Sequence, residues 1–247
     1  MDDPVAAVRR WLAEAGSVAA LTGAGISTAS GIPDFRGPQG LWTRSPAAQR
    51  LSSIDAYLAD PEVRERSWIG RRDHPAWAAR PNAGHRALVD LEQSGRLTCL
   101  ATQNIDGLHQ AAGSRRVLEL HGTIRDTVCL SCGDRRPMAE ALARLGDDPD
   151  PPCLVCGGIL KSATVSFGQP LDAHVLDAAA LGAGTCDLFL AIGSTLSVHP
   201  AAGLCDLALE AGARLVVVND SETPYDDRAE VRLGGRIEEV LPVLVAP

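Results

Sequence analysis

Four of the seven cysteines fall in two matched C-x-x-C pairs, Cys129 with Cys132 and Cys153 with Cys156. Each pair can offer two thiolates from one tight turn, and two such pairs supply the tetrahedral ligand set of a structural zinc ion. A redox motif would explain one pair but not a second pair after a twenty-residue insert. Because four thiolates leave no position open for water, we expect this metal to stabilise the fold and to take no part in chemistry.

A glycine-rich turn near the N-terminus has the composition of a phosphate-binding loop. The apolar run 18–21 predicts a buried strand, and Gly23 and Gly25 then turn the chain into a segment of helical character. Glycines at such a turn let backbone N–H groups approach a pyrophosphate. Thr28 stands where the dinucleotide-binding fingerprint has its third glycine, so a plain strand-to-helix turn stays open as an alternative. The polar loop 30–37 carries a phenylalanine between an acid and a base, which is unusual for a simple connection. This composition favours nucleotide binding over a plain turn.

Polar residues also follow two later apolar runs. Gln103, Asn104 and Asp106 come after one run, and His121 ends the next. Asn104 and Asp106 could simply cap a helix. A histidine is more often a core or surface residue than a catalytic one, and we interpret His109 and four others in that way. His121 is the exception, because it shares with the glycine loop the carboxyl edge of the predicted sheet, where open α/β sheets bind ligands.

The elements that must position these residues are continuous apolar runs alternating with helical segments. Strands are predicted over 18–21, 97–102, 117–120, 165–168, 187–192, 215–218 and 231–233. Helices are predicted over 1–15, 82–95, 200–211 and 237–244, the last of which Pro242 could end early. This pattern indicates a parallel sheet covered on both faces. Residues 41–80 predict a small helical insert, with helices over 54–60 and 62–72.

Composition limits the possible partners and locations. A net charge of −8 over 247 residues argues against a nucleic-acid-binding surface. No apolar run reaches the length of a membrane span, and the first residues lack the basic start and apolar core of a signal peptide. We therefore expect a cytoplasmic protein, a monomer, with no membrane or direct nucleic-acid partner. Cys99, Cys186 and Cys205 are expected to be buried, inert thiols.

Several motifs occur in one order and at suitable spacing. They are GAGIS and GIPDFRG within 23–37, TQNIDGLH at 102–109, LHG at 120–122, the cysteine pairs, VSFG at 165–168, GSTLSVHP at 193–200 and VND at 218–220. On these motifs the chain resembles, over nearly its whole length, the bacterial-type sirtuins, which are NAD-dependent protein-lysine deacylases. The resemblance implies an α/β fold, with a Rossmann-like parallel sheet and a small domain made of a zinc ribbon and a helical insert. The large NAD-binding domain would comprise 1–40, 81–125 and 161–247, and the small domain 41–80 and 126–160.

The resemblance also implies roles for single residues. His121, Asn104 and Asp106 would be catalytic, the last two by binding the nicotinamide ribose and carboxamide. The cofactor contacts would be Gly23, Ala24, Gly25, Ser27, Asp34, Phe35, Arg36, Gln103, Asn104, Ile105, Asp106, Gly193, Ser194, Thr195, Asn219 and Ile237. The substrate contacts would be Trp68, Arg71, Val165, Phe167, Gly168 and Val198. The substrate peptide would pair as a strand between 167–169 and 197–199.

The chemistry implied by the resemblance is glycosyl transfer. The acyl oxygen of the lysine would attack the ribose carbon of NAD, a consumed co-substrate, as nicotinamide leaves. His121 would then act as general base on a ribose hydroxyl, a task that suits an imidazole with an ordinary pKa near 6.5. The products would be the deacylated lysine, O-acyl-ADP-ribose and nicotinamide.

Two departures from the family pattern leave the acyl and peptide preferences open. Gln169 stands where the family often has glutamate, and Trp68-Ile-Gly-Arg71 replaces the Tyr-x-x-Arg pair of desuccinylating relatives. Arg71 could meet an acidic acyl chain or be an ordinary surface arginine. A mono-ADP-ribosyltransferase or NAD hydrolase on the same fold would share the NAD residues. A catalytically silent NAD-sensing module or zinc-ribbon binding protein is a further alternative, and His121 beside an intact NID motif argues against it. A dehydrogenase is disfavoured, because no clear ribose-binding acid follows the second strand.

Overall fold

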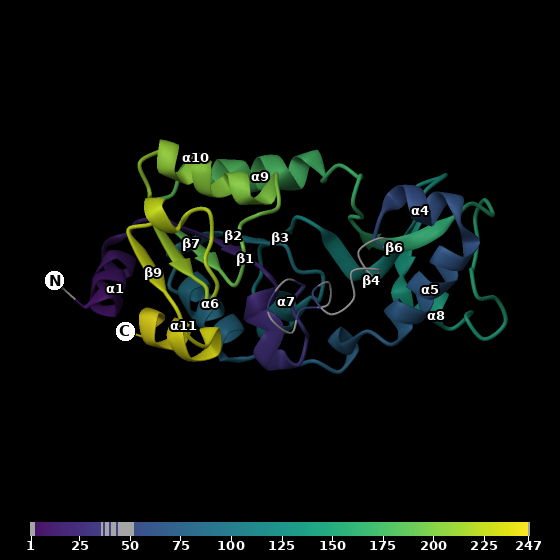
Figure 1. The fold of residues 1–247 in the computed structure, drawn as a ribbon, viewed down its shortest axis with the longest axis horizontal. Helices are drawn as coiled ribbons and strands as arrows, with labels where there is room; N and C mark the ends of the chain where they lie inside the picture. The colour runs from purple at the N-terminus through teal and green to yellow at the C-terminus, as the bar shows by residue number, and fades with distance from the viewer. Residues whose placement is uncertain (1–2, 36, 38–39, 41–42, 44–51, 247) are drawn as a thin grey trace.

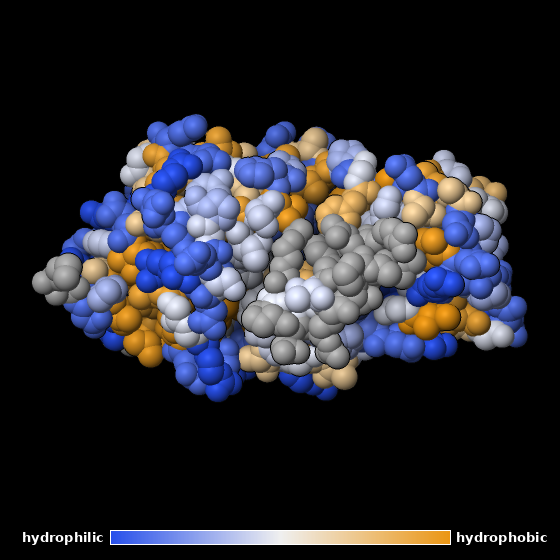
Figure 2. All heavy atoms as spheres, viewed as in Figure 1, coloured by the Kyte–Doolittle hydropathy of each residue, from blue (hydrophilic) through white to orange (hydrophobic). Residues whose placement is uncertain are grey.

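The structure is a computed structural model that describes residues 3–35, 37, 40, 43 and 52–246. It contains two sheets, a six-stranded one next to both chain ends and a three-stranded one at the far end of the molecule (Figure 1). Among the described residues, no helix is long and apolar enough to cross a bilayer. Figure 2 shows hydrophobic residues in several separate groups among hydrophilic ones, over the α1 and α11 end and over the smaller sheet's helices.

The larger sheet is parallel and has the strand order β3-β2-β1-β7-β8-β9. Its strands are β1 (Val18–Thr22), β2 (Leu97–Thr102), β3 (Val117–Glu119), β7 (Leu188–Ile192), β8 (Arg214–Val218) and β9 (Val231–Leu233). Every residue of β1 and β7 is buried, as the continuous apolar runs predict for a sheet covered on both faces. The order reverses between β1 and β7, which is where such sheets bind ligands. The predicted doubly wound α/β class is confirmed.

Helices cover both faces of this sheet (Figure 1). One face packs against α1 (Pro4–Glu14), α6 (Ala83–Gln93) and α11 (Ile237–Val245). The other packs against α9 (Ala173–Ala183) and α10 (Leu204–Glu210), which the short η3 (Ala201–Gly203) precedes. The remaining elements of this part are η1 (Ala24–Ser30), α7 (Leu108–Ala112) and η4 (Asp226–Arg228). Pro242 lies inside α11 and does not end it early, and Leu241 and Leu244 on either side of it are buried against the sheet.

The smaller sheet is antiparallel, with the order β5-β4-β6. Its strands are β4 (Gly122–Cys129), β5 (Arg135–Pro137) and β6 (Leu160–Thr164), and its helices are α4 (Ile54–Ala59), α5 (Pro61–Arg72), η2 (Pro75–Trp77) and α8 (Met138–Leu142). Its core joins Trp68, Met138 and Leu160 to the two buried cysteines of the C-x-x-C pairs. The helical insert is thus confirmed over 54–72, while residues 41–42 and 44–51 lie outside the described residues.

The predicted strand over 165–168 is wrong. The strand is β6, which ends at Thr164 and pairs antiparallel with β4 rather than joining the larger sheet. Gly168, with φ of 88°, has a backbone conformation that no strand continues. The proposed domain boundaries at 125/126 and 160/161 stay a prediction, and β4 and β6 each run across one of them.

Candidate active site

The glycine loop after β1 lies against the loop after β7, at the point where the strand order reverses. The N–H of Gly23 donates to the carbonyl of Ile192, and that of Gly25 to the carbonyl of Gly193, each at 2.9 Å. A Cβ on Gly23 or Gly25 would come within 2.7 Å of Gly193 backbone atoms. Glycine is therefore required here because two backbones touch. Both N–H groups already donate to carbonyls within the chain, so they are not available to a dinucleotide. The glycines would instead allow a dinucleotide to lie close to the backbone.

Three polar side chains form a buried network beside this loop. The hydroxyl of Ser27 donates to Asp106 Oδ2 at 2.7 Å and accepts from Asn104 Nδ2 at 3.2 Å. Asn104 Nδ2 also donates to the carbonyl of Gly23 at 3.0 Å. The other oxygen of Asp106 accepts from the N–H of Leu108, the first residue of α7, at 2.8 Å, so Asp106 also satisfies a donor at this helix end although the N-cap is Gly107. The network therefore ties the loop after β2 to the loop after β1.

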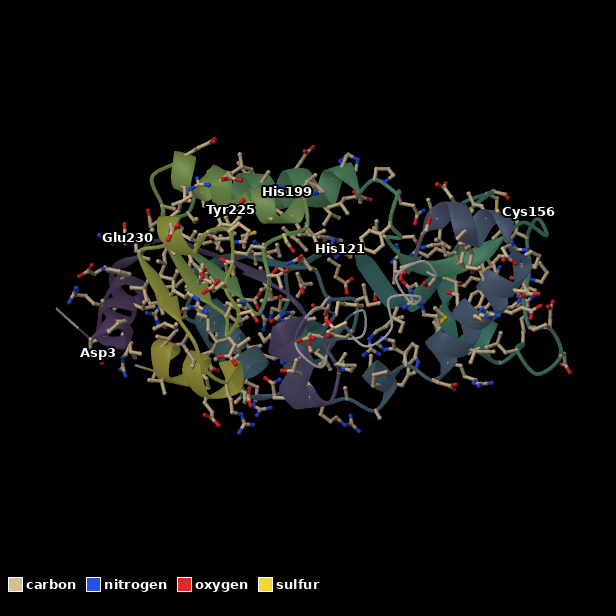
Figure 3. The ribbon with its side chains drawn as sticks, in the orientation of Figure 1. Asp3, His121, Cys156, His199, Tyr225 and Glu230 are labelled. Atoms are coloured by element: carbon tan, nitrogen blue, oxygen red, sulfur yellow. The ribbon has the colours of Figure 1, made fainter. Side chains whose placement is uncertain are left out.

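His121 lies between the two sheets, far from the cysteine cluster at the end of the molecule that Cys156 marks (Figure 3). Its Nδ1 lies 2.9 Å from the carbonyl oxygen of Gln103. A carbonyl can only accept, so Nδ1 carries the proton in the neutral ring and Nε2 keeps a lone pair. Burial lowers the pKa of His121, partly offset by this hydrogen bond. A neutral imidazole with a basic Nε2 is what a general base requires.

A second link joins the loops after β2 and β7. Gln103 Nε2 donates to the hydroxyl of Ser194 at 2.8 Å, and the N–H of Gln103 donates to the carbonyl of Thr22 at 2.9 Å. Gln103, which orients His121, is therefore itself held by the end of β1 and by the loop after β7. The predicted gathering of residues at the carboxyl edge is present in the structure for Ser27, Gln103, Asn104, Asp106, His121, Gly193 and Ser194.

The segment after β6 runs directly beside His121. The N–H of Val165 donates to the carbonyl of His121 at 2.8 Å, and Arg71 Nη2 donates to the hydroxyl of the preceding Thr164 at 3.2 Å. Phe167 is 39% exposed, but its N–H and carbonyl bond to Ser52 and Ile54. One backbone edge of Phe167 is thus already paired within the chain, which limits how a peptide could pair there.

Other predicted site residues lie apart from this network. Trp68 is 1% exposed and lies in the core of the smaller sheet, away from the surface. Ile237 begins α11 and is likewise a core residue. Asp34 caps its own loop by accepting from the N–H of Gly37. Arg36 lies outside the described residues.

The remaining predicted contacts make local contacts in the structure. Thr195 bonds to Ser197 Oγ, and Asn219 Nδ2 to the carbonyl of Ser221. The carbonyl of Val198 accepts from Ala202. Phe35 is 39% exposed. Ala24 opens η1, Ile105 packs against a small apolar cluster, and Gly168 faces Ile54.

The four cysteines of the paired motifs come together as predicted. Their sulfur atoms all lie within 4.8 Å of one another. The N–H groups of Ser131 and Val155 point at the sulfurs of Cys129 and Cys153, both at 3.4 Å. Gly133 and Gly157, which follow the two pairs, have positive φ values of 75° and 70°, a conformation that glycine adopts readily in such tight turns. A closed four-thiolate set fits structural zinc, and it has no open position for a substrate.

Sequence reasoning missed a set of residues beneath the site. Asn82 was expected only to begin a helix, yet its Nδ2 also donates to the carbonyl of Ile26 and to Ser30 Oγ in η1. His85 and His109 are completely buried beside it. The sequence signal for them was a histidine among the apolar positions of a helix, at 85 and at 109. Each histidine taken singly was interpreted as an ordinary core or surface residue, so the pair was not predicted.

The fold and site define a doubly wound α/β protein with a glycine loop where the strand order reverses and a four-cysteine cluster that fits a structural metal. The Sir2 family profile matches residues 23–200. The chain therefore belongs to the Sir2 family.

Curated relatives and solved structures agree with this assignment. The chain is 56% identical to NAD-dependent protein deacetylase 2 of Streptomyces coelicolor over 92% of this chain and 96% of that protein. It is 42% identical to NAD-dependent protein deacetylase 1 of Pyrobaculum aerophilum, over 98% and 94%. A Sir2 structure with a deacetylated p53 peptide and 3′-O-acetyl ADP-ribose matches with a TM-score of 0.91 and 34% identity, over 97% of this chain and 96% of that one. A Sir2–p53 peptide–NAD⁺ structure matches with a TM-score of 0.86 and 35% identity, over 94% and 93%.

Proposed function

We propose that this member of the Sir2 family removes acyl groups from lysine side chains of proteins and consumes NAD in doing so. Its relatives carry the name NAD-dependent protein deacetylase, and related structures hold a peptide with NAD⁺ or with an acetylated ADP-ribose. The observation that carries the proposal for this chain is the hydrogen bond from His121 to Gln103, because it leaves Nε2 as a base beside the buried Ser27–Asn104–Asp106 network.

Each residue of the site then has a task that its contacts allow. NAD, when bound, supplies a ribose carbon that accepts the acyl oxygen as nicotinamide leaves. Asn104 and Asp106, held by Ser27, orient the nicotinamide half. His121 takes a proton from a ribose hydroxyl at Nε2, while the carbonyl of Gln103 stabilises the charged ring that results. Val165, bonded to the backbone of His121, places the acyl-lysine next to this base.

The finer proposal concerns the acyl group. The guanidinium of Arg71 contacts Thr164 beside Val165, and among the described residues no carboxylate forms an ion pair with it. Burial lowers its pKa, so a carboxylate on the substrate would be a favourable partner. An acyl chain that ends in a carboxylate would therefore bind here better than its uncharged counterpart.

A panel of acyl-lysine peptides tests both parts. Acetyl, propionyl, longer and succinyl peptides are incubated with NAD, and the products are identified by mass spectrometry. O-acyl-ADP-ribose and nicotinamide are expected. ADP-ribosylated protein or free ADP-ribose alone would instead indicate the transferase or hydrolase that the same fold could support. Arg71→Leu should lower kcat/KM for the succinyl peptide selectively, and the neighbouring Arg72→Leu, whose side chain pairs with Asp73, is the matched control.

The peptide-bound Sir2 structures support an acyl-lysine peptide as the partner. The expected monomer, the cytoplasmic location and the absence of a nucleic-acid partner stay predictions.

A further inference from the structure

Two histidines meet in the core beneath the glycine loop. His85 lies on α6 and His109 on α7, and their side chains are 0% and 1% exposed. The ring centroids are 4.9 Å apart and the planes are tilted by 59°. Among the described residues, His85 Nε2 and His109 Nδ1 have no hydrogen-bond partner. A buried polar atom without a partner is costly, so a pair of such atoms on adjacent rings calls for an explanation.

The surrounding hydrogen bonds define which ring nitrogens carry protons. The N–H of Asn82 donates to His85 Nδ1 at 3.4 Å, so that nitrogen is an acceptor and the proton of the neutral ring lies on Nε2. Thr22 donates its hydroxyl proton to Thr102 Oγ1 at 2.8 Å. Thr22 Oγ1 must therefore accept from His109 Nε2, which lies 2.9 Å away. His109 Nδ1 is then the acceptor of its ring.

The two unpartnered atoms are thus one donor and one acceptor. We propose that His85 Nε2–H donates to His109 Nδ1, directly or through one buried water, and that this bond completes a one-directional relay that positions the cofactor loops. The relay runs from the N–H of Asn82 through both rings to the hydroxyls of Thr22 and Thr102. Centroids 4.9 Å apart leave space for such a bond between the two rings.

Both ends of the relay reach residues of the active site. At one end Asn82 holds η1 through the carbonyl of Ile26 and Ser30 Oγ. At the other end Thr102 Oγ1 accepts from the N–H of Asn104 at 3.1 Å, and Thr22 directly precedes Gly23. Among the described residues, the rings of His85 and His109 form no hydrogen bond with a predicted site residue, so they are positioning residues for the loops that hold Ser27 and Asn104. The relay itself does not depend on the proposed function. Only its expected effect on NAD turnover rests on that function.

Burial is the main reason that both rings stay neutral. Asp106 raises and Arg86 lowers the pKa of His85, but burial dominates and sets it to about 4. For His109, burial and the neighbouring His85 lower the pKa to about 3. A neutral ring has one donor and one acceptor, which is the condition that a one-directional relay requires.

Nitrogen NMR of the full-length protein with labelled histidine tests the relay without any assay. Both rings should be neutral Nε2–H tautomers throughout pH 5 to 8, with the His85 Nε2 proton protected from exchange. A His109 ring protonated on Nδ1, or either ring charged at pH 6, would overturn the proposal. This readout stands even if the protein showed no NAD turnover at all, an outcome that would count against the proposed function alone.

Two substitutions of one residue test the effect on the site. His85→Gln places an amide donor near the position of Nε2, whereas His85→Leu removes every polar atom. The leucine variant should raise KM for NAD and lower kcat/KM for NAD about tenfold or more, with the KM for peptide unchanged, since one buried partner is lost. The glutamine variant should recover most of that loss, and exposed His174→Gln should behave as wild type. Equal NAD kinetics for leucine and wild type, or no rescue by glutamine, would contradict the relay. If the leucine variant does not fold, the NMR result decides.

Discussion

The imidazole of His121 and the backbone carbonyl of Gln103 are joined by a hydrogen bond of 2.9 Å. This one contact determines which nitrogen of the ring can act as a base. It also connects the base to the larger sheet, because Gln103 is held by Thr22 and Ser194. His121 belongs to the chain segment that enters β4, so the contact bridges the two sheets at the candidate site.

The pH dependence of turnover should reflect this ring. Burial lowers the pKa of His121 below its ordinary value near 6.5. The reactive form is neutral, so kcat/KM should be constant above that ordinary value and fall only as the pH drops through the lowered pKa. An acid limb of the profile with its midpoint above pH 6.5 would contradict this assignment.

His121→Ala should lose turnover by about 10²-fold or more while still binding NAD, as measured by nicotinamide release and by calorimetry.

The side chain of Ser27 should contribute more to NAD binding than that of its neighbour Thr28 in η1. Its hydroxyl donates to the buried carboxylate of Asp106, and a hydrogen bond to a charged group contributes about 1.5–3 kcal/mol. Ser27→Ala should therefore raise KM for NAD about tenfold to a hundredfold, since 1.4 kcal/mol is tenfold. Thr28→Ala is the control, because Thr28 is exposed and its hydroxyl donates to the carbonyl of Gly25. Similar NAD kinetics for the two variants would show that the Ser27 network is unimportant.

Alanine substitutions at two glycines with similar φ values distinguish the cost of backbone strain from the cost of a steric clash. Gly193 and Gly212 have φ of 62° and 86°. A Cβ at Gly193 would lie 2.6 Å from the backbone N of Ile26, whereas at Gly212 nothing lies within 4 Å. Gly212→Ala should cost about 1 kcal/mol of unfolding free energy from the left-handed conformation alone. Gly193→Ala should cost clearly more and should also weaken NAD binding, both measured by denaturant titration and calorimetry. Equal costs would mean that the two loops can separate freely.

Removing the metal should unfold the smaller sheet before the larger one. Cys129 and Cys153 are buried in the core with Trp68, so two of the four zinc ligands are part of that core. Cys153→Ser or a strong chelator should abolish the one bound zinc per chain, lower the melting temperature and reduce turnover indirectly. Cys205→Ala, in the core of the larger sheet, should lower stability without changing the zinc content. A zinc content near zero in the unmodified protein would contradict the assignment.

The buried histidines predict a loss of stability in acid. Their folded pKa values, about 4 for His85 and about 3 for His109, lie below the unfolded value, so the unfolded chain binds more protons as the pH falls. Unfolding free energy should therefore decrease as the pH drops from about 6.5 toward 4. His85→Gln should reduce this decrease by on the order of 2 kcal/mol relative to wild type, as measured by urea unfolding at each pH. An unchanged slope would mean that His85 is already charged in the folded protein.

Local pattern was enough to predict several features of this protein. The strands β1, β2, β7 and β8 follow from continuous apolar runs, and the cysteine site follows from spacing, because both depend on residues close together in the chain. His121 could be selected because polar residues after parallel strands must gather at one edge.

Tertiary structure alone decided the rest. The contacts of Gly25 with Gly193, of Arg71 with Thr164 and of Thr22 with His109 join positions far apart in the chain. It also placed Trp68 in the zinc-site core and made β6 a partner of β4. No local periodicity encodes such pairs, because which residues meet depends on how two sheets and their helices pack, and packing is a property of the whole folded chain.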